Sequence, residues 1–205
     1  MRRSMIDPCV LPTLLFALLL APGSSQAQAT QAGAAKSSSA LSPELVSAKS
    51  ALAKYSDPLV AIRDGYFSTV ACIDFPKGAV DGPIEYPPGA MGVHFLNTAN
   101  IGPQLDPAKP QVLIYEPDGT KLKLVAAEWF VPAAAVTGDK SPAIFGQTLA
   151  GPMAGHEPIM PAALRHYDLH VWLWKDNPKG MFTSTNAAVK CDPKAPYTHA
   201  EGMHH

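Results

Sequence analysis

The hydrophobic pattern near the start of the folded region predicts two short helices. Ser42 and Pro43 are the residue types of a helix N-cap and of a first helical position. An apolar stripe at helical spacing follows, made of Leu45, Ala48, Leu52 and Tyr55. Pro58 interrupts this stripe, and residues 59–64 predict a second short helix that ends at Gly65.

From residue 91 onward the pattern becomes typical of strands. Residues 91–97 predict a short strand, and residues 112–116 and 121–131 predict a hairpin around the turn sequence at 117–120. Residues 165–175 predict a third strong strand, because apolar and polar side chains alternate there.

Segments without periodicity separate these elements. Residues 30–41 predict a flexible leader, residues 132–163 a long ordered loop or lid, and residues 192–205 a disordered tail. Residues 74–90 hold several prolines and glycines and predict a loop. The fold class is therefore predicted as α+β. A helical N-terminal segment packs on a small, mainly antiparallel sheet or barrel, in one domain over residues 42–191.

The first 29 residues have the pattern of a secretory signal peptide. Arg2 and Arg3 precede a short apolar run over residues 10–21, and the small residues at 27–29 form a cleavage site. The apolar run is too short for a stable membrane span. The sequence predicts a bacterial protein exported to the periplasm or the extracellular space, with no stable membrane insertion after cleavage.

Charge and cysteine content narrow the function classes. The formal net charge of −1 at pH 7 provides no basic surface for nucleic acid or for an anionic membrane. Beyond the signal peptide, which contains Cys9, only Cys72 and Cys191 remain. In an oxidising compartment they predict one disulfide. A cysteine metal pair is the less favoured alternative, because the two residues are far apart and lack a CxxC partner.

The predicted strand over residues 165–175 carries the most informative chemistry. One face holds the core residues Tyr167, Leu169, Val171 and Leu173. The other face holds His166, Asp168, His170, Trp172 and Trp174. Two imidazoles with a carboxylate between them can converge on one ion or ligand, or the carboxylate can orient a histidine. The alternative is a solvated polar face, and the two tryptophans argue against it.

Three further positions place ligand-type residues among apolar ones. Strict alternation puts Glu128 on one apolar face of its strand with Leu122, Leu124, Ala126 and Phe130, where a carboxylate needs a cation or several donors. The alternative is a bulge that turns it outward, or a hydrogen bond to a buried backbone group. His94 lies between apolar neighbours and is either a ligand or a satisfied core residue. His156 and Glu157 lie on a proline-stiffened loop that can close over a site, or they are an exposed pair without a role.

No sequence signature names a reaction. Pro158 follows Glu157, so there is no HExxH motif, and GxSxG, Walker and GxGxxG motifs are also missing. The predicted metal ligands are His94, Glu128, His156, His166 and His170. Glu157 and Asp168 are predicted to support them, and the predicted pocket wall is Phe95, Tyr167, Trp172 and Trp174. Such ligands suit zinc, copper or iron, and copper has an added hint from Met153 and Met160, which bracket His156.

Four segments of the chain resemble a family of small exported bacterial proteins without an established activity. Their sequences are GVHFLN, EWFVP, GPMAGHEP and HYDLHVWLW, and the resemblance covers roughly residues 45–192. It implies one exported domain and no particular mechanism. A small barrel with His and Glu ligands is also similar to cupins, but the HxH ligand pair of cupins does not occur in this sequence.

Three hypotheses for function follow. The first is an exported metal-binding domain with a His/carboxylate site, and the sequence leaves open whether it is an enzyme. The second is a non-enzymatic module that binds a small molecule in an aromatic- and histidine-lined pocket. The third is a purely structural, disulfide-closed domain with buried, satisfied histidines.

Overall fold

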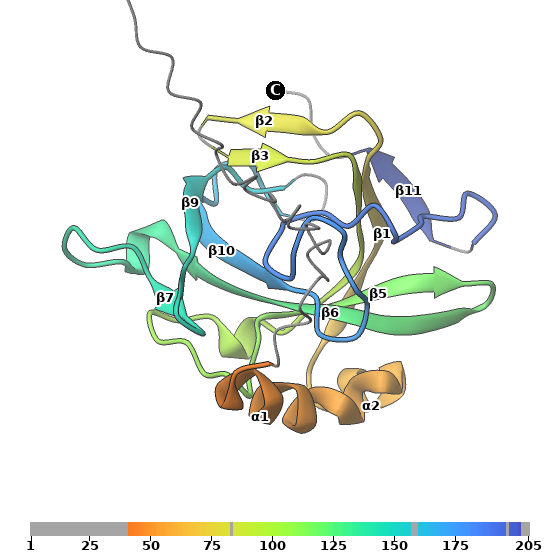
Figure 1. Ribbon diagram of the computed structural model, residues 1–205, viewed down its shortest axis with the longest axis horizontal. Helices are drawn as coiled ribbons and strands as arrows, with labels where there is room; N and C mark the ends of the chain where they lie inside the picture. The colour runs from red at the N-terminus through yellow and green to blue at the C-terminus, as the bar shows by residue number, and fades with distance from the viewer. Residues whose placement is uncertain (1–40, 83, 157–159, 196, 202–205) are drawn as a thin grey trace, which may run out of the picture. The chain divides into compact units, whose positions relative to one another are not determined.

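Seven strands form one curled, mostly antiparallel sheet, and a short helical segment packs against one side of it (Figure 1). The computed structural model describes residues 41–82, 84–156, 160–195 and 197–201. The predicted signal peptide and all but the last residue of the predicted leader lie outside these residues. The described residues are mostly β with a small helical part. The predicted combination of a helical segment and an antiparallel sheet is therefore present, although the helical content is small.

The helices begin where the local sequence predicts them. Helix α1 is Pro43–Leu52, and the Ser42 side chain accepts a hydrogen bond from the backbone N–H of its third residue. A 3-10 turn, η1 (Ala53–Ser56), leads to α2, Pro58–Arg63, which begins one residue earlier than predicted because Asp57 caps it. Among the described residues, none of the helices has the length and apolar character needed to cross a membrane.

The sheet has the strand order β11-β1-β4-β5-β6-β10-β9. The strands are β1 (Phe67–Phe75), β4 (Gly89–Leu96), β5 (Val112–Asp118), β6 (Lys121–Pro132), β9 (Ala150–Met153), β10 (His166–Val171) and β11 (Thr198–Glu201). All neighbours are antiparallel except β1 and β11, which are parallel. The predicted hairpin is β5–β6, and the predicted strand at 91–97 is β4.

Several predicted loops contain strands. The segment 74–90 holds a small hairpin, β2 (Ala79–Asp81) with β3 (Ile84–Tyr86), and the segment 132–163 holds β9 and another hairpin. That second hairpin joins β7 (Ala143–Ile144) to β8 (Gln147–Thr148). The predicted disorder from residue 192 is wrong for β11, which pairs with β1. Pairing with a distant strand supplies backbone hydrogen bonds that local sequence does not reveal.

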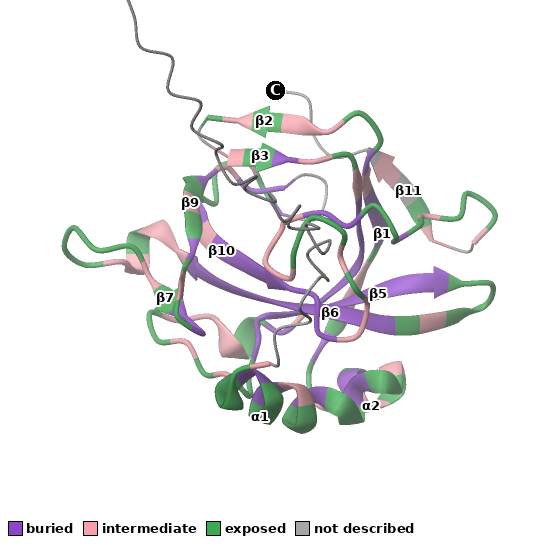
Figure 2. Cartoon of the chain, in the orientation of Figure 1, coloured by how far each residue is buried: buried purple, intermediate pink, exposed green. Residues whose placement is uncertain are grey.

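Both faces of the central strands are buried (Figure 2). On β6, Trp129 packs into the cluster shared with the helices, whereas Phe130 packs into a second cluster on the opposite face. A β-bulge at Val125 interrupts the alternation, since Tyr115 pairs with Leu124 and Ile114 with Ala126. The predicted single face from Leu122 to Phe130 is therefore wrong. Leu122 and Leu124 face the helices, and Ala126 and Phe130 face away.

The predicted disulfide is present. Cys72 of β1 is bonded to Cys191, with a sequence separation of 119 residues. It fastens the segment before β11 to β1, which lies next to the edge strand β11. The prediction that the two cysteines pair with each other is confirmed.

Candidate metal centre

Three strands place His94, Glu128 and His170 together on the face of the sheet that points away from the helices. His170 of β10 lies directly opposite Glu128 of β6. His94 of β4 pairs with Ile114 of β5, the strand between β4 and β6. Because of the bulge at Val125, Glu128 lies on this face and not on the helix side with Leu122 and Leu124. The three residues are 3%, 2% and 1% exposed, so their polar atoms are shielded from water.

The distances within this first group fit a shared ion better than hydrogen bonds. Glu128 Oε2 lies 3.6 Å from His94 Nε2 and 3.6 Å from His170 Nε2. Hydrogen bonds between such atoms are shorter, at about 2.7–3.2 Å. Two ligand atoms that are each about 2.1 Å from one ion lie about 3.0–3.6 Å apart at ordinary coordination angles. This first group could therefore hold a metal ion.

A second group consists of His156, His166 and Asp168. His166 and Asp168 lie on the same face of β10, and His156 comes from the loop after β9. His166 Nε2 is 3.7 Å from Asp168 Oδ2, and the ring centroids of the two histidines are 5.2 Å apart. In each group, one possible ligand atom per residue lies within 4.8 Å of the others.

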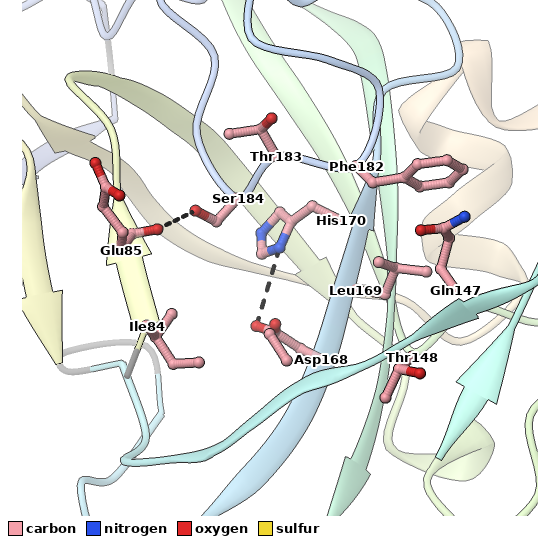
Figure 3. A pocket seen from close by; sticks show the side chains of 11 residues that line it. Ile84, Glu85, Gln147, Thr148, Asp168, Leu169, His170, Phe182, Thr183 and Ser184 are labelled. Atoms are coloured by element: carbon pink, nitrogen blue, oxygen red, sulfur yellow. Dashed lines mark hydrogen bonds and ion pairs between the residues drawn. The ribbon is translucent and has the colours of Figure 1, made fainter. Parts of the chain in front are cut away.

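The two groups meet at His170. Its Nε2 faces Glu128, whereas its Nδ1 lies 3.9 Å from Asp168 Oδ2, the contact drawn in Figure 3. One imidazole thus presents a different ring nitrogen to each group. The ligand-type residues form a continuous buried chain from His94 to His166.

Several buried ring nitrogens and one carboxylate oxygen of these groups lack hydrogen-bond partners. Within the described part of the chain, the buried side-chain nitrogen and oxygen atoms without a partner are His94 Nδ1 and Nε2, His166 Nε2, Asp168 Oδ2, and His170 Nδ1 and Nε2. Each unsatisfied buried polar group costs about 1–3 kcal/mol. A bound cation would remove much of that cost, because it supplies the missing partner.

Burial holds the histidines in the form that binds metals. Burial, with the neighbouring His170 and His156, lowers the pKa of His94 to about 3, and burial lowers the pKa of His156 to about 4. Burial also lowers the pKa of His170. These three imidazoles are neutral at pH 7, and a neutral imidazole has the lone pair that a metal needs.

The two carboxyl groups differ in their electrostatics. Burial, together with the negative charge of Asp168, raises the pKa of Glu128 well above its ordinary value. Burial alone would raise the pKa of Asp168 as well, but the adjacent His166 and His170 hold it below its ordinary value. Without a cation, Glu128 tends to keep its proton while Asp168 is ionised. Metal binding at Glu128 would release that proton.

Two cavities border the groups and differ greatly in size. His94, Glu128 and His156 line a cavity of about 20 Å³, which is room for an ion or one water molecule but not for an organic ligand. Asp168 and His170 line a more open groove of about 320 Å³ (Figure 3). Its other walls include polar side chains of Glu85, Gln147, Thr148, Thr183 and Ser184. Asp168 and His170 are therefore the members of the groups that line the larger space.

The structure brings all five predicted ligands into the two groups. Asp168, predicted only as a supporting residue, lies among the possible ligands. Glu157 lies outside the described residues. The hydroxyl of Tyr86 lies 3.0 Å from His156 Nε2 and was not predicted, because a residue in an apparent loop carries no local signal of this contact.

The predicted aromatic pocket wall is wrong for three of its four members. Phe95, Tyr167 and Trp174 pack on the helix side of the sheet. Phe95 and Tyr167 follow His94 and His166 directly, so alternation turns them to the opposite face. Strand β10 ends at Val171, not at residue 175, so the alternation does not extend to Trp174. Trp172 packs on the same side as the histidines, with its indole N–H donating to the carbonyl of Thr183.

Searches against protein-family models, curated proteins and solved structures give no match for this chain. The resemblance to a family of small exported proteins stays a prediction.

Proposed function

We propose that this protein is a metal-binding domain that acts outside the cytoplasm. A divalent transition-metal ion is held by His94 and His170 through their Nε2 atoms and by the Glu128 carboxylate. The single observation that carries this proposal is the convergence of these buried atoms at 3.6 Å separations, too long for hydrogen bonds. The Cys72–Cys191 disulfide and the predicted signal peptide support export.

A satisfied polar core is the main competing explanation for the buried histidines. In that case, each imidazole nitrogen would have a donor or acceptor at hydrogen-bond distance. Both ring nitrogens of His94 and of His170 lack one. Four such atoms would cost on the order of 4–12 kcal/mol, which is comparable with the whole stability of a domain. An ion that binds these nitrogens offsets that cost.

The ligand types narrow the choice of metal. Two imidazoles and one carboxylate are nitrogen and oxygen donors, which suit Zn²⁺ and Fe²⁺. The thioether of Met153 already accepts a hydrogen bond from Tyr86, which weakens the argument for copper. When bound, such an ion would supply a Lewis acid with coordination positions left for water or a small ligand.

A small-molecule binding module is the second candidate function. The groove of about 320 Å³ favours it, since this volume lies at the lower end of the range for ligand sites. The polar side chains of Thr148 and Ser184 in its wall would suit a small polar ligand. This function does not require a metal ion.

Metal analysis by mass spectrometry tests the proposal. The protein is exported to the periplasm of a bacterial host without an affinity tag and compared with the His94→Ala and His170→Ala variants. Lys54→Ala serves as a control, because Lys54 is exposed and pairs with Asp64 on the helical segment, away from the two groups. We expect the parent protein and the control to contain bound metal. In the His94→Ala and His170→Ala variants, the ion of the first group should be lost. No bound metal in a folded parent protein, even after incubation with Zn²⁺ or Fe²⁺, would overturn the proposal.

A further inference from the structure

We propose that the metal centre is dinuclear, with a second divalent ion held by His156, His166 and Asp168. This inference rests on the proposed metal-binding function and adds a second site to it. The three residues are 8%, 0% and 4% exposed, so the second group is also buried. Their chemistry again calls for a transition metal that accepts imidazole and carboxylate ligands.

The hydrogen bonding of His166 supplies the first argument. Its Nδ1 lies 3.2 Å from the carbonyl oxygen of Leu164. A carbonyl only accepts, so Nδ1 carries a proton and Nε2 is the ring nitrogen left for a metal ion. This Nε2 lies 3.7 Å from Asp168 Oδ2, which is longer than a hydrogen bond and close to the separation of two ligand atoms on one ion.

Tyr86 orients the third member of the group in the same way. The Tyr86 hydroxyl donates to Met153 Sδ at 3.0 Å and lies 3.0 Å from His156 Nε2. Both contacts are satisfied at once when the hydroxyl donates to the thioether and His156 Nε2–H donates to the Tyr86 oxygen. In that tautomer the lone pair of His156 lies on Nδ1. Tyr86 is therefore a positioning residue, comparable to the hydrogen-bond partners that orient metal-binding histidines.

Gly155 allows the loop to deliver His156. A Cβ atom at this position would collide with the backbone carbonyl of Pro161. The close approach is part of a turn, in which Gly155 N donates to Ala162 O at 3.2 Å and Met160 N to His156 O at 2.8 Å. A side chain at residue 155 would force this turn apart and move His156.

A single ion with Asp168 as an orienting carboxylate is the simpler alternative. In that arrangement, Asp168 would accept a hydrogen bond from His170 Nδ1–H. The distance between these atoms is 3.9 Å, beyond the hydrogen-bond range. Asp168 Oδ2 is closer to His166 Nε2, at 3.7 Å, and no hydrogen bond engages either atom. The geometry thus favours Asp168 as a ligand.

The groove borders both groups. Asp168 of the second group and His170 of the first line it, whereas His94, Glu128 and His156 line the smaller cavity. A small polar molecule in the groove would therefore lie beside both groups.

Zinc stoichiometry tests the dinuclear centre. The full exported chain is saturated with Zn²⁺, desalted and measured by native mass spectrometry together with elemental analysis. We expect two equivalents in the parent, and one in each of His94→Ala and His166→Ala. One equivalent in the parent, or loss of all zinc in both variants, would overturn the second site and leave the proposed function intact. No zinc in the parent would overturn both.

Tyr86→Phe keeps the test decisive if the histidine variants fail to fold. It leaves every ligand in place and removes only the hydroxyl that orients His156. We expect the affinity for the second equivalent of Zn²⁺ to fall about 10-fold or more, with the first unchanged. Tyr66→Phe is the matched control, because its hydroxyl donates to Pro110 O away from both groups. Equal zinc affinities in the two variants would overturn the role of Tyr86 and the second site that it supports.

Discussion

Glu128 and His170 lie directly opposite each other on β6 and β10, with Oε2 and Nε2 3.6 Å apart and both side chains at most 3% exposed. A non-hydrogen-bonded carboxylate–imidazole contact at this depth is costly unless a cation joins it. The pair is therefore the most direct place to separate metal binding from folding.

Glu128→Gln should weaken metal binding without destabilising the metal-free protein. The change replaces the carboxyl group by an amide of nearly the same shape. It thereby also removes a buried ionisable group, whose pKa is raised by burial. We expect at least a 10-fold loss of Zn²⁺ affinity at the first group, with the metal-free free energy of unfolding unchanged or higher by about 1 kcal/mol. Zinc titration and urea unfolding in chelator measure the two effects.

Glu116→Gln is the matched control for that variant. The Glu116 carboxylate accepts hydrogen bonds from Lys175 Nζ at 2.6 and 2.7 Å and from Lys190 N at 3.0 Å. Its loss should lower the free energy of unfolding by about 1–3 kcal/mol and leave zinc binding unchanged. If both variants lost zinc equally, the effect of Glu128→Gln would be structural.

The metal-free protein should lose stability as the pH falls below about 6.5. The folded-state pKa of His94 is about 3 and that of His156 about 4, both below the unfolded value, and that of His170 is also lowered. The unfolded chain binds more protons in this window, so stability is present above pH 6.5 and decreases toward pH 4. Each such group contributes a slope of up to about 1.4 kcal/mol per pH unit.

Glu128 contributes with the opposite sign. Its pKa is raised in the folded protein, so its contribution is present at low pH and is lost as the pH rises through the folded value. Urea unfolding in chelator from pH 4 to pH 7.5 measures the sum. An unfolding midpoint that stays constant below pH 6.5 would contradict the burial of three neutral histidines.

Reduction of the disulfide should destabilise the fold more than it affects metal binding. Cys72 and Cys191 close a loop of 119 residues, for which the chain-entropy model estimates roughly 4–5 kcal/mol. Neither cysteine belongs to the two groups. Unfolding curves with and without reductant, and a Cys72→Ser/Cys191→Ser variant, measure the effect. A free energy of unfolding that does not change would show that the bond adds little to stability.

Gly155→Ala should displace His156 and affect the second group alone. The added methyl group would collide with the carbonyl of Pro161, so the turn must open. We expect the second equivalent of Zn²⁺ to be lost and the first retained. Gly102→Ala is the control, since a Cβ there meets no atom within 4 Å. Retention of both equivalents by Gly155→Ala would contradict the delivery of His156 by this turn.

The helix starts could be predicted because they depend on neighbours in sequence. The Ser42 and Asp57 side chains cap residues two or three positions away, and a proline follows each of them.

Strand β1 could not be predicted, because its sequence lacks a regular alternation of buried and exposed positions. Val70 has a positive φ of 55°, and the register shifts between Ser68 and Cys72, so burial along the strand does not alternate regularly.

The residues of the candidate site could be predicted, but their grouping could not. Glu128, His166 and His170 stood out as ligand-type residues among apolar ones, and all are buried. Asp168 changed from a supporting residue to a possible ligand because of its distance to His166, which the spacing of the strand does not determine.

By itself, the sequence determined that one face of β10 carries two histidines and a carboxylate, since the alternation of a strand is a local property of the backbone. Only the tertiary structure decided what lies beside that face. His94 and Glu128 reach it through strand order and register, and His156 through the turn at Gly155. These relationships arise from pairing between distant segments, which no local pattern encodes.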